Sequence, residues 1–159
     1  MSINLTEIPL GLPGQIYRSP MPYSKFDNAQ DLFSLYKKSG ITTVVVLISD
    51  EESLEKSGRD LNRIYRDNGY RIIHMPIPDF SIPNIEQFRQ AVQMTIERLQ
   101  AKERVAVHCH AGIGRSGLFL SCLAKQVKGI SGEQAIAWVR RYIKGAVEVP
   151  EQIAMVESF

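Results

Sequence analysis

The segment from residue 104 to residue 127 constrains the fold more than any other part of this chain. It begins with a short apolar run rich in β-branched residues, 104–108, which is typical of a strand buried on both faces. Residues 115–127 are apolar on nearly every side, so we expect them to form a central, buried helix. A loop that contains Gly112 and Gly114 joins the strand to the helix. This order of elements is the basic unit of an α/β domain.

The rest of the chain continues this alternation. Apolar runs at 42–48, 71–75 and, more briefly, 15–18 predict further strands. Helical patterns separate them, in these segments: 33–37, ended by Gly40; 61–65, ended by Asn68-Gly69; 84–99; and 131–142. No repeat, low-complexity stretch or linker divides the sequence. We therefore predict one α/β domain over residues 1–159, with a central, mostly parallel sheet flanked by helices.

Two of these helices carry clear start signals. Asn84 with Gln87 three positions later, and Ser131 with Gln134, are typical of residues that cap a helix N-terminus. The first helix should turn one stripe toward the core: Phe88, Ala91, Val92, Thr95, Ile96 and Leu99. The second should do the same with Ala135, Ile136, Val139 and Tyr142.

Composition and charge exclude several classes of protein. With 159 residues, 44% hydrophobic and 23% charged, the chain can bury a core without disulfides. The net charge of +2 does not favour a nucleic-acid partner, and no apolar run approaches the ~20 residues of a membrane helix. Residues 1–7 lack a basic segment followed by an apolar block, so we expect a cytoplasmic protein without a secretory signal. We also expect a monomer. Cys109 and Cys122 should then be free thiols.

The loop after the 104–108 strand carries the chemistry. Gly112 and Gly114 allow positive φ and a close backbone approach, so that successive N–H groups can converge on one anion. The start of the next helix adds its partial positive charge, and the planar guanidinium of Arg115 matches two phosphate oxygens. Cys109 lies at the first position of this cradle, so we expect it to be a thiolate near neutral pH.

Other loop motifs and a metal site do not fit these residues. A Walker A loop requires Lys and Ser or Thr after its last glycine, but Leu118 and Phe119 follow Gly117. A Gly-x-Ser-x-Gly nucleophile elbow requires glycine where Leu118 stands. His108, Cys109 and His110 are adjacent, which suits no common zinc-ligand spacing. We expect neither a metal nor a cofactor.

The run His108-Cys109-x5-Arg115-Ser116 resembles the signature of cysteine-dependent protein tyrosine and dual-specificity phosphatases. The similarity to the small dual-specificity-like branch extends from Tyr17-Arg18-Ser19 to Pro150-Glu151-Gln152 and implies the fold of that branch. It also implies that Cys109 attacks phosphorus and forms a phosphocysteine, that Ser116 helps the thiolate leave, and that His108 supports the loop. Phosphate would bind the following residues: His110, Ala111, Gly112, Ile113, Gly114 and Arg115.

The resemblance also implies a general acid upstream of the nucleophile. Asp79 is the candidate, in a loop that Pro76, Pro78 and Pro83 stiffen. It would protonate the leaving group and later accept a proton from water; a turn aspartate that caps local amides is the alternative. The acidic run 50–52 we interpret as a solvated helix entry.

Five further residues have weaker assignments. Gln152 either orients the hydrolytic water, as a glutamine does in some relatives, or begins a surface helix. Arg18 is expected to be structural, and Arg140 and Arg141 to face water. Cys122 is expected in the core, although a protective disulfide with the loop cysteine stays open.

The loop chemistry specifies a phosphate monoester and leaves its class open. Relatives that act on phosphoinositides commonly carry lysine in this loop, whereas residues 110–114 include none. We therefore expect a phosphoprotein or phosphopeptide substrate, with a phosphoinositide or other small phosphomonoester as the alternative. We find no counterpart near the N-terminus of the loop that clamps phosphotyrosine in larger relatives. We therefore expect a shallow pocket that accepts phosphotyrosine, with phosphoserine and phosphothreonine open. A non-catalytic phosphate-binding module, a rhodanese-like sulfurtransferase and an RNA 5′-phosphatase are the rival functions.

Overall fold

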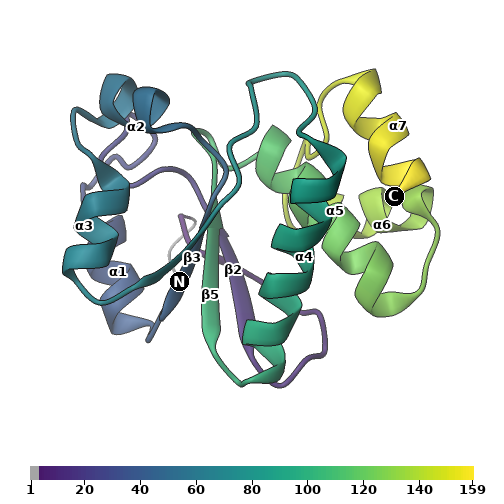
Figure 1. The fold of residues 1–159 in the computed structure, drawn as a ribbon, viewed down its shortest axis with the longest axis horizontal. Helices are drawn as coiled ribbons and strands as arrows, with labels where there is room; N and C mark the ends of the chain where they lie inside the picture. Colours follow the sequence, from purple (N-terminus) through teal and green to yellow (C-terminus); the bar gives the residue numbers. More distant parts are fainter. Residues whose placement is uncertain (1–3) are drawn as a thin grey trace.

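The computed structural model describes residues 4–159 and builds them around a five-stranded sheet (Figure 1). The strand order is β1-β2-β5-β3-β4. The strands are β1 (Thr6–Ile8), β2 (Gln15–Ser19), β3 (Thr43–Val46), β4 (Arg71–His74) and β5 (Arg104–His108). Only the β1–β2 pair among these described strands is antiparallel, and the other pairs are parallel. The predicted α/β fold with a mostly parallel sheet is confirmed.

Helices cover both faces of the sheet. Figure 1 shows the first three helices on one side and the other four on the opposite side. The helices are α1 (Leu32–Lys38), α2 (Asp50–Ser57), α3 (Leu61–Asp67), α4 (Ile85–Gln100), α5 (Gly114–Lys128), α6 (Gly132–Arg140) and α7 (Pro150–Ser158). Within residues 4–159, no helix combines the length and the apolar character that crossing a membrane requires.

The strand register brings the functional loop to one edge of the sheet. His108, the last residue of β5, pairs with Ser19 at the end of β2 and with Val46 at the end of β3. The carboxyl ends of three parallel strands therefore meet where the loop after His108 begins. This edge is where open α/β sheets commonly bind ligands.

The strand at 104–108 has the predicted bounds. Elsewhere two strands are shorter than predicted, one strand was not predicted, and one helix ends earlier. The 42–48 and 71–75 runs are strands only over Thr43–Val46 and Arg71–His74. The sequence did not predict β1, because three residues at an edge are too few to show a period of two. Tyr142 lies beyond α6, which ends at Arg140; its ring instead packs against Trp138 at 5.2 Å between centroids.

The capping signals act as predicted. The side chain of Asn84 accepts the N–H of Gln87 at 3.0 Å at the start of α4. Ser131 and Gln134 form a reciprocal capping box at the start of α6. The six residues of the α4 stripe are all buried, and within it the ring of Phe88 meets that of Phe119 edge-on at 5.5 Å. This contact joins α4 to the central helix α5.

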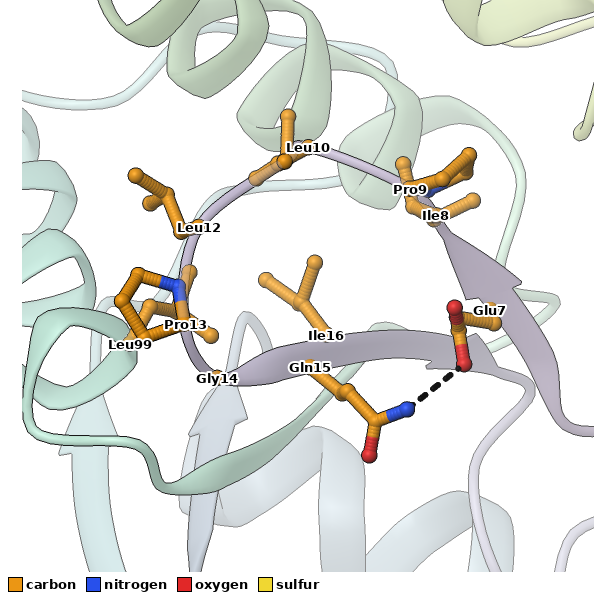
Figure 2. A pocket seen from close by; sticks show the side chains of 11 residues that line it. Glu7, Ile8, Pro9, Leu10, Leu12, Pro13, Gly14, Gln15, Ile16 and Leu99 are labelled. Atoms are coloured by element: carbon orange, nitrogen blue, oxygen red, sulfur yellow. Dashed lines mark hydrogen bonds between the residues drawn. The ribbon is translucent and has the colours of Figure 1, made fainter.

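The β1–β2 connection borders an open pocket that contains no residue of the functional loop (Figure 2). Leu10, Leu12 and Ile16 line it, and Gln15 donates a hydrogen bond to Glu7 at 3.2 Å. Gly14 is required at this point because a Cβ there would lie 2.8 Å from the Leu99 carbonyl oxygen. The pocket has no nucleophile, so we treat it as part of the packing of the β1–β2 hairpin.

The α4 stripe yields a prediction for stability. Replacing Phe88 with alanine should lower the free energy of unfolding by ~3–5 kcal/mol, because the substitution leaves a cavity against Phe119. Met94→Ala on the exposed side of the same helix should change it by no more than ~0.5 kcal/mol. Urea denaturation of the two variants measures both values, and equal losses would contradict the assigned inward face.

Candidate active site

The loop that follows β5 surrounds the sulfur of Cys109 with hydrogen-bond donors. Cys109 is 2% exposed, and its Sγ accepts the N–H of Gly112 and the hydroxyl of Ser116, each at 3.2 Å. Gly112 has φ +79°, and a Cβ there would lie 2.5 Å from the carbonyl oxygen of Ser19. Glycine is therefore needed both for the backbone conformation and for the close approach to β2. Both contacts direct hydrogen-bond donors at the sulfur.

Neighbouring residues hold the loop carbonyls away from the sulfur. Arg18 donates from Nε to the Gly112 carbonyl at 2.9 Å and from Nη2 to the Ala111 carbonyl at 3.3 Å. The N–H of Met21 donates to the carbonyl of His110 at 2.9 Å. Because these carbonyl groups have partners on the outer side of the loop, the N–H groups are free to turn inward. The structural role expected for Arg18 is confirmed.

His108 lies behind the nucleophile and carries no charge. It is fully buried, and burial lowers its pKa from its ordinary value to about 4. Its Nδ1 is 3.0 Å from the carbonyl oxygen of Cys109, which can only accept, so Nδ1 holds the proton. Its Nε2 then accepts from the hydroxyl of Tyr65 at 2.8 Å. The ring fixes the backbone of the nucleophile and is not placed to carry a proton.

The guanidinium of Arg115 is buried and bound by a carboxylate from α2. Its Nη1 and Nη2 donate to Oε1 and Oε2 of Glu52 at 2.8 and 2.7 Å, and Nη1 also donates to the carbonyl of Ile77 at 3.1 Å. Burial works against the charge of Arg115, but its bonds to Glu52 raise its pKa overall. The same hydrogen bonds lower the pKa of Glu52.

The interpretation of residues 50–52 as a solvated helix entry is wrong for Glu52. The three residues do begin α2, whose N-cap is Ser49. The side chain of Glu52, however, is only 19% exposed, because it turns toward Arg115, 63 positions away in the sequence. Acidic residues in a first helical turn normally reflect the helix dipole, so the local pattern gave no signal of this pairing.

Asp79 approaches the remaining edge of Arg115. Its Oδ1 lies 3.4 Å from Nε, and its side chain is half exposed. The next residue, Phe80, has a φ of +54°. Its N–H donates to Oδ1 of Asp79 at 3.1 Å. Left-handed backbone is uncommon for an aromatic residue and is held only when the surroundings favour it. Here it presents the ring of Phe80 to solvent, 61% exposed, beside the carboxylate.

Cys109 lies in a small pocket of about 180 Å³ formed by four segments of the chain. Its lining is Lys25, Phe26, Asp79, Phe80, Cys109, His110, Ala111, Gly114, Arg115 and Glu148. The predicted nucleophile, arginine and acid are thus brought together. Ser116 lies beneath the sulfur, and Gly112, Ile113 and His108 are in or behind the loop outside the lining.

The sequence missed four lining residues: Phe80, next to the predicted acid, and three that lie elsewhere in the chain. Lys25 and Phe26 belong to the irregular segment between β2 and α1, and the ring of Phe26 meets that of His110 edge-on at 4.9 Å. Glu148 reaches the pocket because its carboxylate lies over the Cα of Gly114, where a Cβ would collide with it.

Arg140 holds the segment that carries Glu148. It donates from Nε to the carbonyl of Ala146 at 2.7 Å and from Nη2 to that of Val147 at 2.9 Å. Arg140 is exposed, as expected, and its guanidinium also satisfies two carbonyls of a turn. Val147 has φ +61°, an unusual conformation for a β-branched residue.

Gln152 and Cys122 are both buried. Pro150, Glu151 and Gln152 do begin a helix, α7, and the first two are exposed, but Gln152 is only 1% exposed and does not lie at the surface. Gln152 is also absent from the pocket lining. Cys122 is in the core of α5 as expected, burial raises its pKa to about 12, and both it and Cys109 are free thiols.

Comparison with known proteins places this geometry in a family. Residues 21–127 match the model of a family described as "Polymorphic toxin system, DSP-PTPase phosphatase". The chain is 29% identical over 154 residues to the dual specificity protein phosphatase CDC14AB of Danio rerio, covering 92% of this chain and 23% of that protein. It is 30% identical over 125 residues to cyclin-dependent kinase inhibitor 3 of Rattus norvegicus, covering 77% and 59%. The chain thus spans less than two thirds of these relatives.

Solved structures agree with this placement. The fold of kinase associated phosphatase, in a form with its catalytic-site cysteine replaced by serine, superposes with a TM-score of 0.88 at 24% identity. That match covers 100% of this chain and 94% of the other. Tk-PTP in its active form gives a TM-score of 0.75 at 31% identity, covering 91% and 90%. From the family model, these similarities and the signature loop, we conclude that the chain belongs to the DSP-PTPase family of cysteine-dependent protein phosphatases.

Proposed function

We propose that this chain is a single catalytic domain that hydrolyses phosphate monoesters on proteins through a phosphocysteine, with phosphotyrosine as its preferred substrate. One observation carries the proposal. The sulfur of Cys109 lies at the base of a pocket, accepts two hydrogen bonds, and shares that pocket with Arg115 and Asp79. Nucleophile, phosphate-binding cation and acid are the three groups that the reaction requires.

In the first step Cys109 Sγ attacks phosphorus in line, and the bond between phosphorus and the ester oxygen breaks. Asp79 gives its proton to that oxygen as it leaves. The N–H groups of the loop and the free edge of Arg115 bind the other phosphate oxygens. Because Glu52 engages both Nη atoms, Nε is the edge that faces the pocket, and the phosphate takes the position beside it that Asp79 now holds.

In the second step water attacks the phosphocysteine and the sulfur–phosphorus bond breaks. Asp79, now a carboxylate, accepts the proton of the water. The hydroxyl of Ser116, 3.2 Å from Sγ, donates to the departing thiolate. The products are inorganic phosphate and the enzyme in its starting state.

The pocket rim supports an aromatic substrate. The nucleophile is buried while the rings of Phe26 and Phe80 stand exposed at the mouth. A phosphotyrosine ring that enters between them makes aromatic contacts on its way to Cys109, which the short side chains of phosphoserine and phosphothreonine cannot make. Lys25 and Glu148 put one charge of each sign on the rim, where a peptide backbone and its neighbouring side chains would lie.

Cys109→Ser tests the proposal directly. This variant should not hydrolyse p-nitrophenyl phosphate, yet should still bind a phosphotyrosine peptide, because the loop donors and Arg115 remain. Cys122→Ala, which removes the other thiol from the core, should keep the activity at a temperature where it is folded. Hydrolysis by Cys109→Ser would contradict the phosphocysteine step. Sulfur transfer from thiosulfate to cyanide by the wild type, without phosphatase activity, would support the rhodanese-like alternative.

Glu52→Gln tests the support of the phosphate-binding arginine. It should lower kcat/KM for p-nitrophenyl phosphate by ~10–100-fold, because Arg115 loses the charge that fixes its orientation. Glu51→Gln, on the exposed side of the same turn, should leave kcat/KM unchanged and is the matched control.

The ion pair between Arg115 and Glu52 also predicts a pH dependence of stability, which Glu52→Gln should remove. Because bonding to Arg115 lowers the pKa of Glu52, the pair stabilises the fold at neutral pH, and this contribution is lost as the pH falls through the lowered pKa. Unfolding by urea at neutral and acidic pH should show this acid-side loss in the wild type and in Glu51→Gln. A loss of equal size in Glu52→Gln would contradict it.

Phe26→Ala and Phe80→Ala test the substrate class. Each should lower kcat/KM for a phosphotyrosine peptide by ~10-fold and change it for the matched phosphothreonine peptide by less than ~2-fold. Leu54→Ala, an exposed apolar residue of α2 outside the pocket lining, is the control. Equal effects on both peptides, or activity confined to phosphoinositide vesicles, would contradict phosphotyrosine as the preferred substrate.

A further inference from the structure

The side chain of Gln152 joins two segments that each carry a pocket residue. Its Nε2 donates to the carbonyl of Ser81 at 3.0 Å, and its Oε1 accepts the N–H of Glu148 at 3.1 Å. Ser81 is two positions after Asp79, and Glu148 itself lines the pocket. One buried amide therefore links the loop between β4 and α4, which carries Asp79 and is called the acid loop below, to the turn before α7. The two linked residues are 71 positions apart in the sequence.

Both linked segments contain a residue in left-handed backbone, Phe80 next to Ser81 and Val147 next to Glu148. Such conformations persist only where contacts around them hold the chain in place. On the Val147 side, Arg140 supplies two hydrogen bonds to the turn, so that Glu148 has a fixed position. On the Phe80 side, the hydrogen bond from Gln152 to Ser81 attaches the acid loop to this fixed turn.

The acid loop has a second attachment on the other side of Asp79. The N–H of Ile77 donates to Leu47 at 3.1 Å, and the carbonyl of Ile77 accepts from Arg115 at the same distance. Asp79 thus lies between the attachment at Ile77 and the attachment at Ser81. Its own contact with Arg115 cannot hold the loop during catalysis, because the substrate phosphate occupies that edge of the guanidinium.

We propose that Gln152 is a positioning residue for the general acid: its bond to Ser81 holds Asp79 at the leaving-group oxygen in the first step. The inference rests on the proposed function and assigns to Gln152 a role other than orienting the hydrolytic water. A water-orienting amide must reach the phosphocysteine, whereas the Gln152 side chain is buried, has partners at both its oxygen and its nitrogen, and is absent from the pocket lining.

Gln152→Ala with a series of aryl phosphates distinguishes the two roles. kcat/KM reports the steps up to departure of the leaving group, and a general acid matters most when that group is a poor one. Gln152→Ala should therefore lower kcat/KM by ~10–100-fold for phenyl phosphate and by less than ~3-fold for p-nitrophenyl phosphate. Because p-nitrophenyl phosphate needs little acid assistance, it also reports whether the variant is folded and its nucleophile intact.

Two further variants sharpen the assignment. Gln152→Glu keeps an acceptor for Glu148 but cannot donate to Ser81, so it should show the same dependence on the leaving group. In a background of Asp79→Asn, adding Gln152→Ala should cause no further loss with phenyl phosphate, because the acid that it positions is already gone. Gln134→Ala, which removes an amide from the α6 capping box, is the matched control and should leave both rates unchanged.

Several outcomes would overturn the inference. Unchanged kcat/KM values with a burst of p-nitrophenol and accumulated phosphocysteine would assign Gln152 to the water step. Equal losses with both substrates, or full recovery in Gln152→Glu, would leave Gln152 a merely structural residue. A failure of the proposed function is a separate result: the wild type would then show no phosphatase activity, or Cys109→Ser would retain it.

Discussion

The buried ion pair between Arg115 and Glu52 is the interaction on which the site depends. Figure 1 shows α2 and α5 on opposite sides of the sheet, and this pair connects them at the carboxyl edge of the strands. A guanidinium that is 3% exposed would be costly without a partner, and the two short hydrogen bonds that it donates to one carboxylate offset that cost. The geometry also leaves Nε directed at the pocket. Stability and the proposed phosphate binding thus use different edges of one side chain.

Two other residues, His108 and Arg18, hold the backbone at the base of the pocket in place. His108 adds no positive charge, because burial keeps it neutral, and its hydrogen bonds only fix the backbone of Cys109. Arg18 acts from outside the loop, where it binds carbonyl oxygens and leaves the N–H groups to face the sulfur. Donors fixed before the substrate arrives need no reorganisation when charge develops on the phosphate, which is the main source of stabilisation in such sites.

Local sequence patterns predicted the parts of the molecule in which neighbours along the chain determine the structure. The 104–108 strand, the α4 stripe and both capping pairs are of this kind, and each was predicted at the correct residues. Glu52, Phe26 and Glu148 are not, because tertiary contacts with distant segments bring Glu52 to Arg115 and bring Phe26 and Glu148 to the pocket. Phe80 and Val147 adopt left-handed backbone that their own preferences oppose, so no local rule could indicate them.

This division between local and tertiary control also separates catalysis from selectivity. In the proposed function the base of the pocket binds the phosphoryl group, which is the same in every monoester, and the nucleophile and the donors of this base come from one contiguous loop. Discrimination between esters requires contacts beyond the phosphate, and these come from segments around residues 26, 80 and 148, which only the folded chain brings together. Two of these segments include strained backbone, so their positions depend on ties such as those of Arg140 and Gln152. Substitutions at these ties should therefore alter which esters react before they alter whether the thiol can react at all.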